Sequence, residues 1–298
     1  MTFKEINVEQ VYQNDNKLKK QDVLALAEWM KKQPHLPKAT ELQLAIFLHS
    51  SNYSNEMAKN VIESYFTMKT LCPDFLGSRT LHDNVLKLAV NTYVFSILPK
   101  QALGGETVVI SKLMDTNLSN FTALGMLKLM DVALALFIHE NGPPCGFQLV
   151  FDMQNSSLAH FLKVNPMLIK KFIYYLQDAM PIRLKHIHFI NPAFFLDKVF
   201  SLIKPTMKKE LFELFVVHSD LKTLFAYIPQ DILPKDYGGN CKSLLEFQEQ
   251  EKQKIEDGEA FLKFQESQVV DESKRQGQSK YNESLFGIDG SFKTLEFD

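Results

Sequence analysis

HIHFINPAFFLDKVFSLIKPTM, residues 186–207, decides the fold, because it joins a strand, a helix start and an apolar stripe in one short segment. The run from His186 to Ile190 is rich in aromatic and β-branched residues, which predicts a strand. Asn191-Pro192 then predicts a helix start, since Asn can accept hydrogen bonds from the first turn and Pro has no N–H to leave unpaired. Pro205 predicts the end of that helix.

An apolar stripe follows one face of this predicted helix. Leu196, Val199, Ile203 and Met207 are spaced three, four and four residues apart, as on one side of an α-helix. Burying four such side chains contributes on the order of 10 kcal/mol. Two interpretations fit the stripe: an ordinary core helix, or a lid over an apolar cavity that opens only where a membrane accepts the exposed face. Periodicity alone does not separate them.

Composition excludes several classes of protein. With 33 basic and 35 acidic residues the net charge is -2, so the chain lacks the concentrated positive field of nucleic-acid binders. Cys72, Cys145 and Cys241 are few, odd in number and far apart, which favours a reducing compartment over a disulfide framework. The first residues, MTFKEINVEQ, lack the apolar core of a signal peptide, and there is no run of about 18 apolar residues, so we expect neither a leader nor a membrane span. These features predict a cytoplasmic protein whose membrane contact is peripheral.

Three segments differ in their pattern. Residues 1–90 are helical throughout, with a capping box predicted between Thr40 and Gln43. Residues 91–245 alternate strands and helices, which predicts an α/β domain with a mostly parallel or mixed sheet. Residues 246–298 are a polar tail, although the final SLFGIDGSFKTLEFD regains apolar residues and is expected to dock back onto the body.

Catalytic signatures are absent. The chain has no G-x-G-x-x-G, no phosphate loop, no G-x-S-x-G and no H-E-x-x-H, so we expect no enzyme. His186 and His188 share one face of a strand and could hold a metal ion, although hydrogen-bond partners are the commoner arrangement. Asp152 fits either a structural carboxylate at a strand end or a catalytic acid. A small hydrolase built on Asp152 and one of these histidines is therefore an alternative hypothesis.

A family resemblance covers most of the chain. Its marks are Phe151-Asp152 after an apolar strand, the pattern Q-D-A-x-P-x-R-x-K-x-I-H-x-I-N over residues 177–191, and I-L-P-x-x-Y-G-G over residues 232–239. With these motifs the sequence resembles the CRAL-TRIO lipid-binding family, in the branch of the tocopherol and retinaldehyde carriers. The ending at 284–298 is similar to that of insect members. The resemblance implies a sheet floor and helical walls around an apolar cavity, with residues 194–207 as its lid.

The same resemblance implies a set of ligand-lining residues from five segments of the chain. They are Met130, Leu134, Phe147, Leu149, Phe151, Val164, Phe172, Tyr175, Leu176, Met180, Ile182, Ile187, Leu196, Val199, Ile203 and Met207. Every member except Tyr175 is apolar, and Met130 and Leu134 replace small serines of the tocopherol carrier. This lining favours one hydrophobic ligand, of isoprenoid type such as tocopherol, a retinoid or a carotenoid, or a lipid. We expect no other cofactor.

Basic residues near the predicted lid are candidates for contact with anionic head groups. They are Arg183, Lys185, Lys204, Lys208 and Lys209. Arg183 and Lys185 match two positions of the family's phosphoinositide-binding cluster, whereas its other positions fall on Ser51, Glu210 and Leu214. Specific phosphoinositide recognition is therefore an open expectation, and a solvated basic face is the alternative.

The sequence thus predicts a carrier that encloses one hydrophobic molecule and exchanges it at anionic membranes through a mobile lid helix. The alternative is a lipid-sensing regulatory module that recruits a partner through its polar tail. Neither the ligand, nor a protein partner, nor the oligomeric state follows from the sequence.

Overall fold

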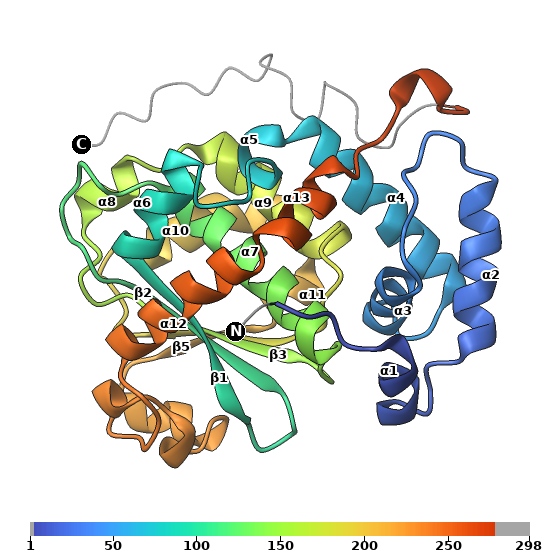
Figure 1. The fold of residues 1–298 in the computed structure, drawn as a ribbon. Coiled ribbons are helices and arrows are strands. Elements are labelled where there is room, and N and C mark those ends of the chain that lie inside the picture. The colour runs from blue at the N-terminus through green and yellow to red at the C-terminus, as the bar shows by residue number, and fades with distance from the viewer. Residues whose placement is uncertain (1–2, 278–298) are drawn as a thin grey trace.

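The computed structural model describes residues 3–277 of the 298-residue chain as an α/β fold (Figure 1). A five-stranded sheet lies beneath a long central helix, and an N-terminal group of helices packs beside them. The predicted α/β class with a helical N-terminal module is confirmed. The expected docking of residues 284–298 lies outside the described residues.

The sheet is mixed, with strand order β1-β2-β3-β4-β5. Its strands are β1 (Tyr93–Gln101), β2 (Thr107–Leu113), β3 (Phe147–Asp152), β4 (Leu184–Ile190) and β5 (Phe215–His218). Strand β1 is antiparallel to β2, and the other pairs are parallel. The sequence analysis did not identify β1, which forms one edge of the sheet.

The N-terminal helices are α1 (Val8–Asn14), α2 (Lys20–Lys31), α3 (Glu41–Ser50), α4 (Asn55–Leu71), α5 (Pro73–Leu76) and α6 (Asn84–Thr92). The predicted capping box at the start of α3 is present. The Gln43 amide N–H donates to Thr40 Oγ1 at 3.2 Å, and the Thr40 N–H donates to Gln43 Oε1 at 2.9 Å. Two orphan N–H groups of the first turn are thereby satisfied.

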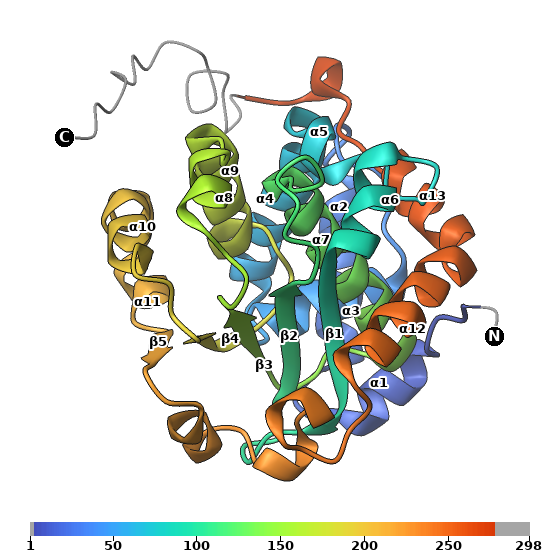
Figure 2. The ribbon, with the colours of Figure 1, turned by 90° about the vertical axis from the view of Figure 1, so that its left-hand side faces the viewer.

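Helices join the strands and cover both edges of the sheet. They are α7 (Ala123–Asn141), α8 (Leu158–Leu162), α9 (Pro166–Asp178), α10 (Leu196–Ile203) and α11 (Lys209–Phe212). Short 3₁₀ segments are η1 (Lys204–Thr206), η2 (Leu221–Ala226), η3 (Gln230–Ile232), η4 (Lys235–Tyr237) and η5 (Glu272–Lys274). Figure 2 shows α10 and α11 beyond the β5 edge and α12 (Leu244–Asp257) beside the β1 edge.

Two apolar cores lie on opposite faces of the sheet. Strand residues alternate between faces, so Phe147 and Leu149 of β3 meet α7 on one side. Val150 of β3 and Ile190 of β4 face the other side, where η2, η3, η4 and the start of α12 cover them. Of the two faces, the first carries the predicted ligand-lining residues.

The predicted lid helix begins later than its sequence indicated. The Asn191-Pro192 start is wrong, because α10 begins at Leu196 and its N-cap residue is Phe195. Asn191 instead has a φ of 48°, and its side-chain amide donates to Asp152 Oδ1 at 2.8 Å. The helix ends at Ile203 and continues as η1, which contains Pro205.

The segment after residue 243 is more ordered than a polar tail. It forms α12 (Leu244–Asp257) and α13 (Glu259–Ser267), which bury Leu244, Ile255 and Leu262 against the body. Gln268 exchanges hydrogen bonds with the Gln43 side chain at 2.7 and 3.0 Å. Amide side chains therefore fasten this polar segment to α3. Within residues 3–277, no helix is long and apolar enough to cross a membrane.

A candidate apolar ligand site

Five phenylalanines form a continuous layer on the α7 face of the sheet. Phe151 of β3 stacks on Phe189 of β4 at 5.7 Å between ring centroids, and Phe189 lies 5.3 Å from Phe215 of β5. Phe200 of α10 covers this row, 5.1 Å from Phe189 and 5.5 Å from Phe215. Phe212 of α11 completes the layer, 5.5 Å from Phe215.

Strand register explains why these rings meet. Phe151 pairs with Phe189, and Leu149 pairs with Ile187, so the four side chains share one face. Phe215 pairs with Ile187 on the other side of β4. The sequence analysis included Phe151 but missed Phe189 and Phe215. The two-residue period of β4 and β5 could have identified both.

Helix α10 presents its apolar stripe to this layer without burying it fully. Leu196 is buried, whereas Val199, Ile203 and Met207 are only half-buried. On the same segment, Leu202 is 48% exposed and Phe194 is 86% exposed. The helix therefore combines a half-covered inner face with exposed apolar residues.

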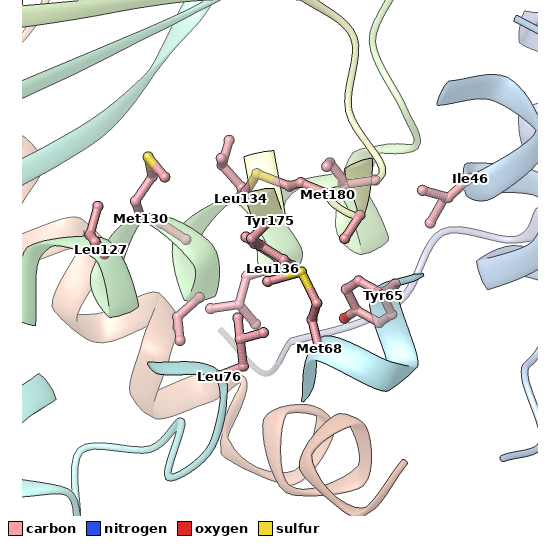
Figure 3. Packing of buried hydrophobic residues seen from close by; sticks show 14 of the residues in the cluster. Ile46, Tyr65, Met68, Leu76, Leu127, Met130, Leu134, Leu136, Tyr175 and Met180 are labelled. Atoms are coloured by element: carbon pink, nitrogen blue, oxygen red, sulfur yellow. The ribbon is translucent and has the colours of Figure 1, made fainter. Parts of the chain in front are cut away.

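The remaining residues of the predicted lining set lie around the phenylalanine layer. Figure 3 shows Met130 and Leu134 extending from α7, with Met180 reaching toward Leu134 from the segment after α9. Fourteen positions belong to or pack against one apolar cluster, namely all predicted lining residues except Leu196 and Val199. Half-buried members lie mainly on the α9 side: Phe151, Val164, Phe172, Leu176, Ile182, Ile203 and Met207. The structure thus brings the predicted set together, while its role as a ligand lining remains a prediction.

Tyr175 is the one polar residue in the predicted lining set, and its hydroxyl forms a hydrogen bond with a buried carboxylate. Its OH donates to Asp131 Oδ1 at 2.5 Å, and Arg79 Nη2 lies 2.7 Å from Asp131 Oδ2. Arg79 also donates to Gln265 Oε1 of α13 at 2.6 Å. All three of Tyr175, Asp131 and Arg79 are at most 5% exposed. The hydroxyl therefore belongs to a buried polar network that ties α5–α6, α7, α9 and α13 together.

The predicted basic residues are not equivalent. Lys208 pairs with Asp178 of α9, and Lys209 pairs with Glu213 at 3.5 Å. Lys204 Nζ lies over the Phe212 ring, 4.7 Å from its centroid, at the rim of the phenylalanine layer. The carboxylates of Asp178 and Glu213 thus partly neutralise the charges of Lys208 and Lys209.

Arg183 lies at the entry of β4, in a cavity of about 490 Å³. Its guanidinium donates to the His49 carbonyl oxygen and to the Tyr53 hydroxyl, 3.4 Å away, while its buried Nε–H has no partner among the described residues. Burial and this cation together lower the pKa of His49 to about 4. Ser51, which replaces a cation of the family pattern, is buried beside them with an unpartnered Oγ.

Asp152 is enclosed by structural partners. Its carboxylate accepts hydrogen bonds from Tyr237 Oη at 2.8 Å, from Asn191 Nδ2 at 2.8 Å and from the Gln154 N–H at 2.9 Å. Lys112 Nζ lies 2.9 Å away. These contacts join the ends of β2, β3 and β4 to η4, which supports the structural interpretation over the catalytic one.

We expect Asp152→Asn to lower the free energy of unfolding by about 2 kcal/mol, because the amide leaves Lys112 without its charge partner. Urea unfolding measures this change. Asp231→Asn, which alters an exposed ion pair with Lys100, is the matched control and should leave stability unchanged. Unchanged stability of Asp152→Asn, accompanied by loss of an ester-hydrolysing activity, would instead support the hydrolase hypothesis.

The strand histidines lie on the opposite face of the sheet from the phenylalanine layer. His188 Nδ1 is 2.9 Å from His218 Nε2, and His188 Nε2 is 3.0 Å from Gln148 Oε1. Burial and the adjacent His218 lower the pKa of His188 to about 3, which keeps the ring neutral. The part of the chain that the structure describes contains no group of three or more His, Cys, Asp or Glu side chains arranged for a metal ion.

Two family descriptions match this chain. One is "CRAL/TRIO domain", which matches residues 91–239, half of the chain and the whole five-stranded sheet. The other is "Pinta-like, UBA domain", which matches residues 15–85 in the N-terminal helices.

Several known proteins are similar to this chain in sequence, among them the following two. "Alpha-tocopherol transfer protein-like" of Mus musculus is 27% identical over 75% of this chain and 66% of its own length. "Clavesin-1" of Xenopus laevis is 24% identical over 65% of this chain and 59% of its own. The chain therefore matches less than two thirds of these relatives. The crystal structure of Sfh5 superposes with a TM-score of 0.47 at 16% identity, covering 88% of this chain and 98% of that one.

Proposed function

Because this chain belongs to the CRAL/TRIO domain family, we propose that it is a carrier that binds one small hydrophobic molecule and exchanges it at membranes. The proposed ligand site is the apolar surface that the phenylalanine layer, α9 and α10 form together. The proposed ligand class is isoprenoid or lipid, in keeping with the tocopherol in the name of one relative. The proposed setting is the cytoplasm, with peripheral membrane contact.

One observation carries the proposal: large apolar side chains stay half-exposed between the sheet and the lid. Phe151, Phe189 and Phe215 of three adjacent strands are only partly buried, as are Ile203 and Met207 of the lid segment. Leaving such surface in water costs about 25 cal/mol per Å². Contiguous apolar surface of this kind is typical of binding sites. A hydrophobic ligand would remove it from water.

Exposed apolar residues beside the lid suggest how a membrane takes part. Phe194 is 86% exposed and packs edge-on against Phe195, which stacks on Phe161 of α8. Leu162 of α8 is 58% exposed. We place these side chains in the bilayer interface, where lipid replaces the contacts that the lid loses on opening. Opening at a membrane then costs less than in water.

Arg183 and Lys185 are proposed to direct the protein to anionic lipid. We expect the double variant Arg183→Ala/Lys185→Ala to slow transfer of a fluorescent tocopherol analogue to vesicles containing phosphatidylserine by about tenfold, since the exposed Lys185 contributes about 1 kcal/mol of attraction and the half-buried Arg183 contributes less. Transfer to neutral phosphatidylcholine vesicles should not change. The measurement is stopped-flow fluorescence at physiological salt.

The control is Lys263→Ala on α13. This variant removes an exposed cation that pairs with Glu259 and that is far from the lid in the sequence. It should transfer at the wild-type rate to both kinds of vesicle. If the double variant also matches the wild type on anionic vesicles, Arg183 and Lys185 have no part in delivery.

A further inference from the structure

Helix α12 carries a carboxylate where its buried stripe requires an apolar residue. Leu244, Phe247 and Ile255 are buried at helical spacing, and Glu251 occupies the position between them at 7% exposure. Buried ionisable groups are normally paired, as Arg79 is with Asp131 in this protein. Among residues 3–277, the groups that act on the Glu251 carboxylate are Lys254 and Glu140, through their charges and without a hydrogen bond.

Glu251 lines a cavity of about 890 Å³ on the β1 side of the molecule, away from the phenylalanine layer. Strand β1, the loop after α7 and helix α12 border it, and one side is open to solvent. A second buried polar group borders the same cavity: Ser96 of β1 is 1% exposed, and its Oγ makes no hydrogen bond to any residue in the described part of the chain. Ile97, Phe137 and Phe247 supply apolar wall. The volume lies within the range of small-molecule sites.

Charges around the cavity favour a positively charged ligand. Burial, together with Glu140 at the end of α7, raises the pKa of Glu251 to about 7, and Lys254 opposes this shift. Lys242 and Lys254, the lining lysines, are exposed, so water screens them. Among the lining residues, Glu251 and Ser96 are therefore a carboxylate and a hydroxyl that are both buried.

We propose that this cavity is a second binding site, for a small amphipathic amine whose ammonium group pairs with Glu251 and whose apolar body lies against Ile97, Phe137 and Phe247. An ammonium ion supplies the charge and the N–H donors that the buried carboxylate lacks. An anionic ligand would be repelled by the carboxylates of both Glu140 and Glu251. The proposal is independent of the carrier function, because none of the residues predicted to line the hydrophobic ligand borders this cavity.

The test compares three probes of one shape by isothermal titration at pH 8: 2-phenylethylamine, 2-phenylethanol and 3-phenylpropionate. We expect the full chain to bind the amine at least tenfold more tightly than the alcohol and not to bind the acid. Glu251→Gln should abolish the preference for the amine. Glu256→Gln, which removes an exposed carboxylate from the same helix, should preserve it. Absence of amine binding, or equal amine affinity in Glu251→Gln, would overturn the proposal.

Stability without any ligand gives a second readout. The pKa of Glu251 is higher in the folded chain than the ordinary value of 4.5, so its contribution to stability is greatest in acid and is lost as the pH rises through about 7. Glu251→Gln should therefore raise the melting temperature at pH 8 and have little effect at pH 4.5. A lower melting temperature at pH 8 would mean that the carboxylate has a structural partner, and would contradict a binding role.

Discussion

Ile203→Asp is expected to weaken binding of a hydrophobic ligand at least about 100-fold while leaving the fold intact. Ile203 is half-buried on the inner face of α10, so an aspartate there stays hydrated while the lid is open. Closing α10 over an apolar ligand would bury that carboxylate without a partner, which costs several kcal/mol. Each 1.4 kcal/mol of this cost weakens binding tenfold.

Retinol, a fluorescent isoprenoid, is a suitable probe for this titration. Leu202→Asp is the matched control, because Leu202 is the preceding residue of α10 and is already 48% exposed. It should bind retinol as the wild type does, and both variants should melt within a few degrees of it. Equal retinol affinity in the Ile203 and Leu202 variants would contradict the assignment of the inner face of α10 to the ligand.

Arg79→Met is expected to lower the free energy of unfolding by about 3–5 kcal/mol. Arg79 is 1% exposed and bridges Asp131 of α7 to Gln265 of α13. Among the described residues, removing it leaves the Tyr175 hydroxyl as the hydrogen-bond donor to Asp131, and breaking a buried ion pair on one side carries a penalty of this size. Because α7 and α9 supply the predicted walls of the ligand site, weaker retention of retinol should accompany the loss of stability.

Chemical unfolding followed by circular dichroism measures the effect. Lys263→Met tests an ion pair of the same type at the surface, where solvent screens the charges, and should leave stability almost unchanged. The double variant Arg79→Met/Asp131→Leu should recover most of the loss, since it removes both charges together. If Arg79→Met alone is as stable as the wild type, this network does not hold the helices together.

Two Asn-Pro pairs show what local sequence can and cannot predict. Asn165-Pro166 starts α9 as expected, because the Asn165 side chain accepts from the Met167 N–H at 2.9 Å. Asn191-Pro192 carries the same signal, yet α10 begins at Leu196. There the Asn191 amide binds Asp152 at the end of β3, a partner 39 residues away in sequence. A tertiary hydrogen bond outweighed the local helix signal.

The inner strands β3 and β4 could be predicted from the sequence, whereas the edge strand β1 could not. The family resemblance predicted Leu149 and Ile187 as lining residues, and the structure pairs them on one face of β3 and β4. Strand β1 escaped prediction because it follows α6 directly, with no turn residue between Thr92 and Tyr93. The sequence of residues 242–264 is compatible with a peripheral helix, but it does not reveal what α12 and α13 pack against. Their polar sequence is held by long-range contacts such as Gln268 to Gln43, which no periodicity reveals.

Tyr175 shows a similar limit inside the candidate site. Its position on the apolar stripe of α9 marks it as a lining residue, but only the structure shows its hydroxyl bonded to Asp131. Burial raises the pKa of this hydroxyl well above its ordinary value, so the group remains a neutral donor. The tyrosine thus offers its ring, rather than its hydroxyl, to the apolar cluster.

Native mass spectrometry of the purified chain, followed by extraction and identification of any released molecule, tests the carrier proposal most directly. The account predicts a stoichiometric 1:1 complex with one isoprenoid or lipid, reduced in Ile203→Asp and retained in Leu202→Asp. A chain that carries no such molecule, and takes none up from vesicles containing tocopherol, retinol and β-carotene, would contradict it. The half-exposed phenylalanine layer would then be ordinary core rather than a ligand site.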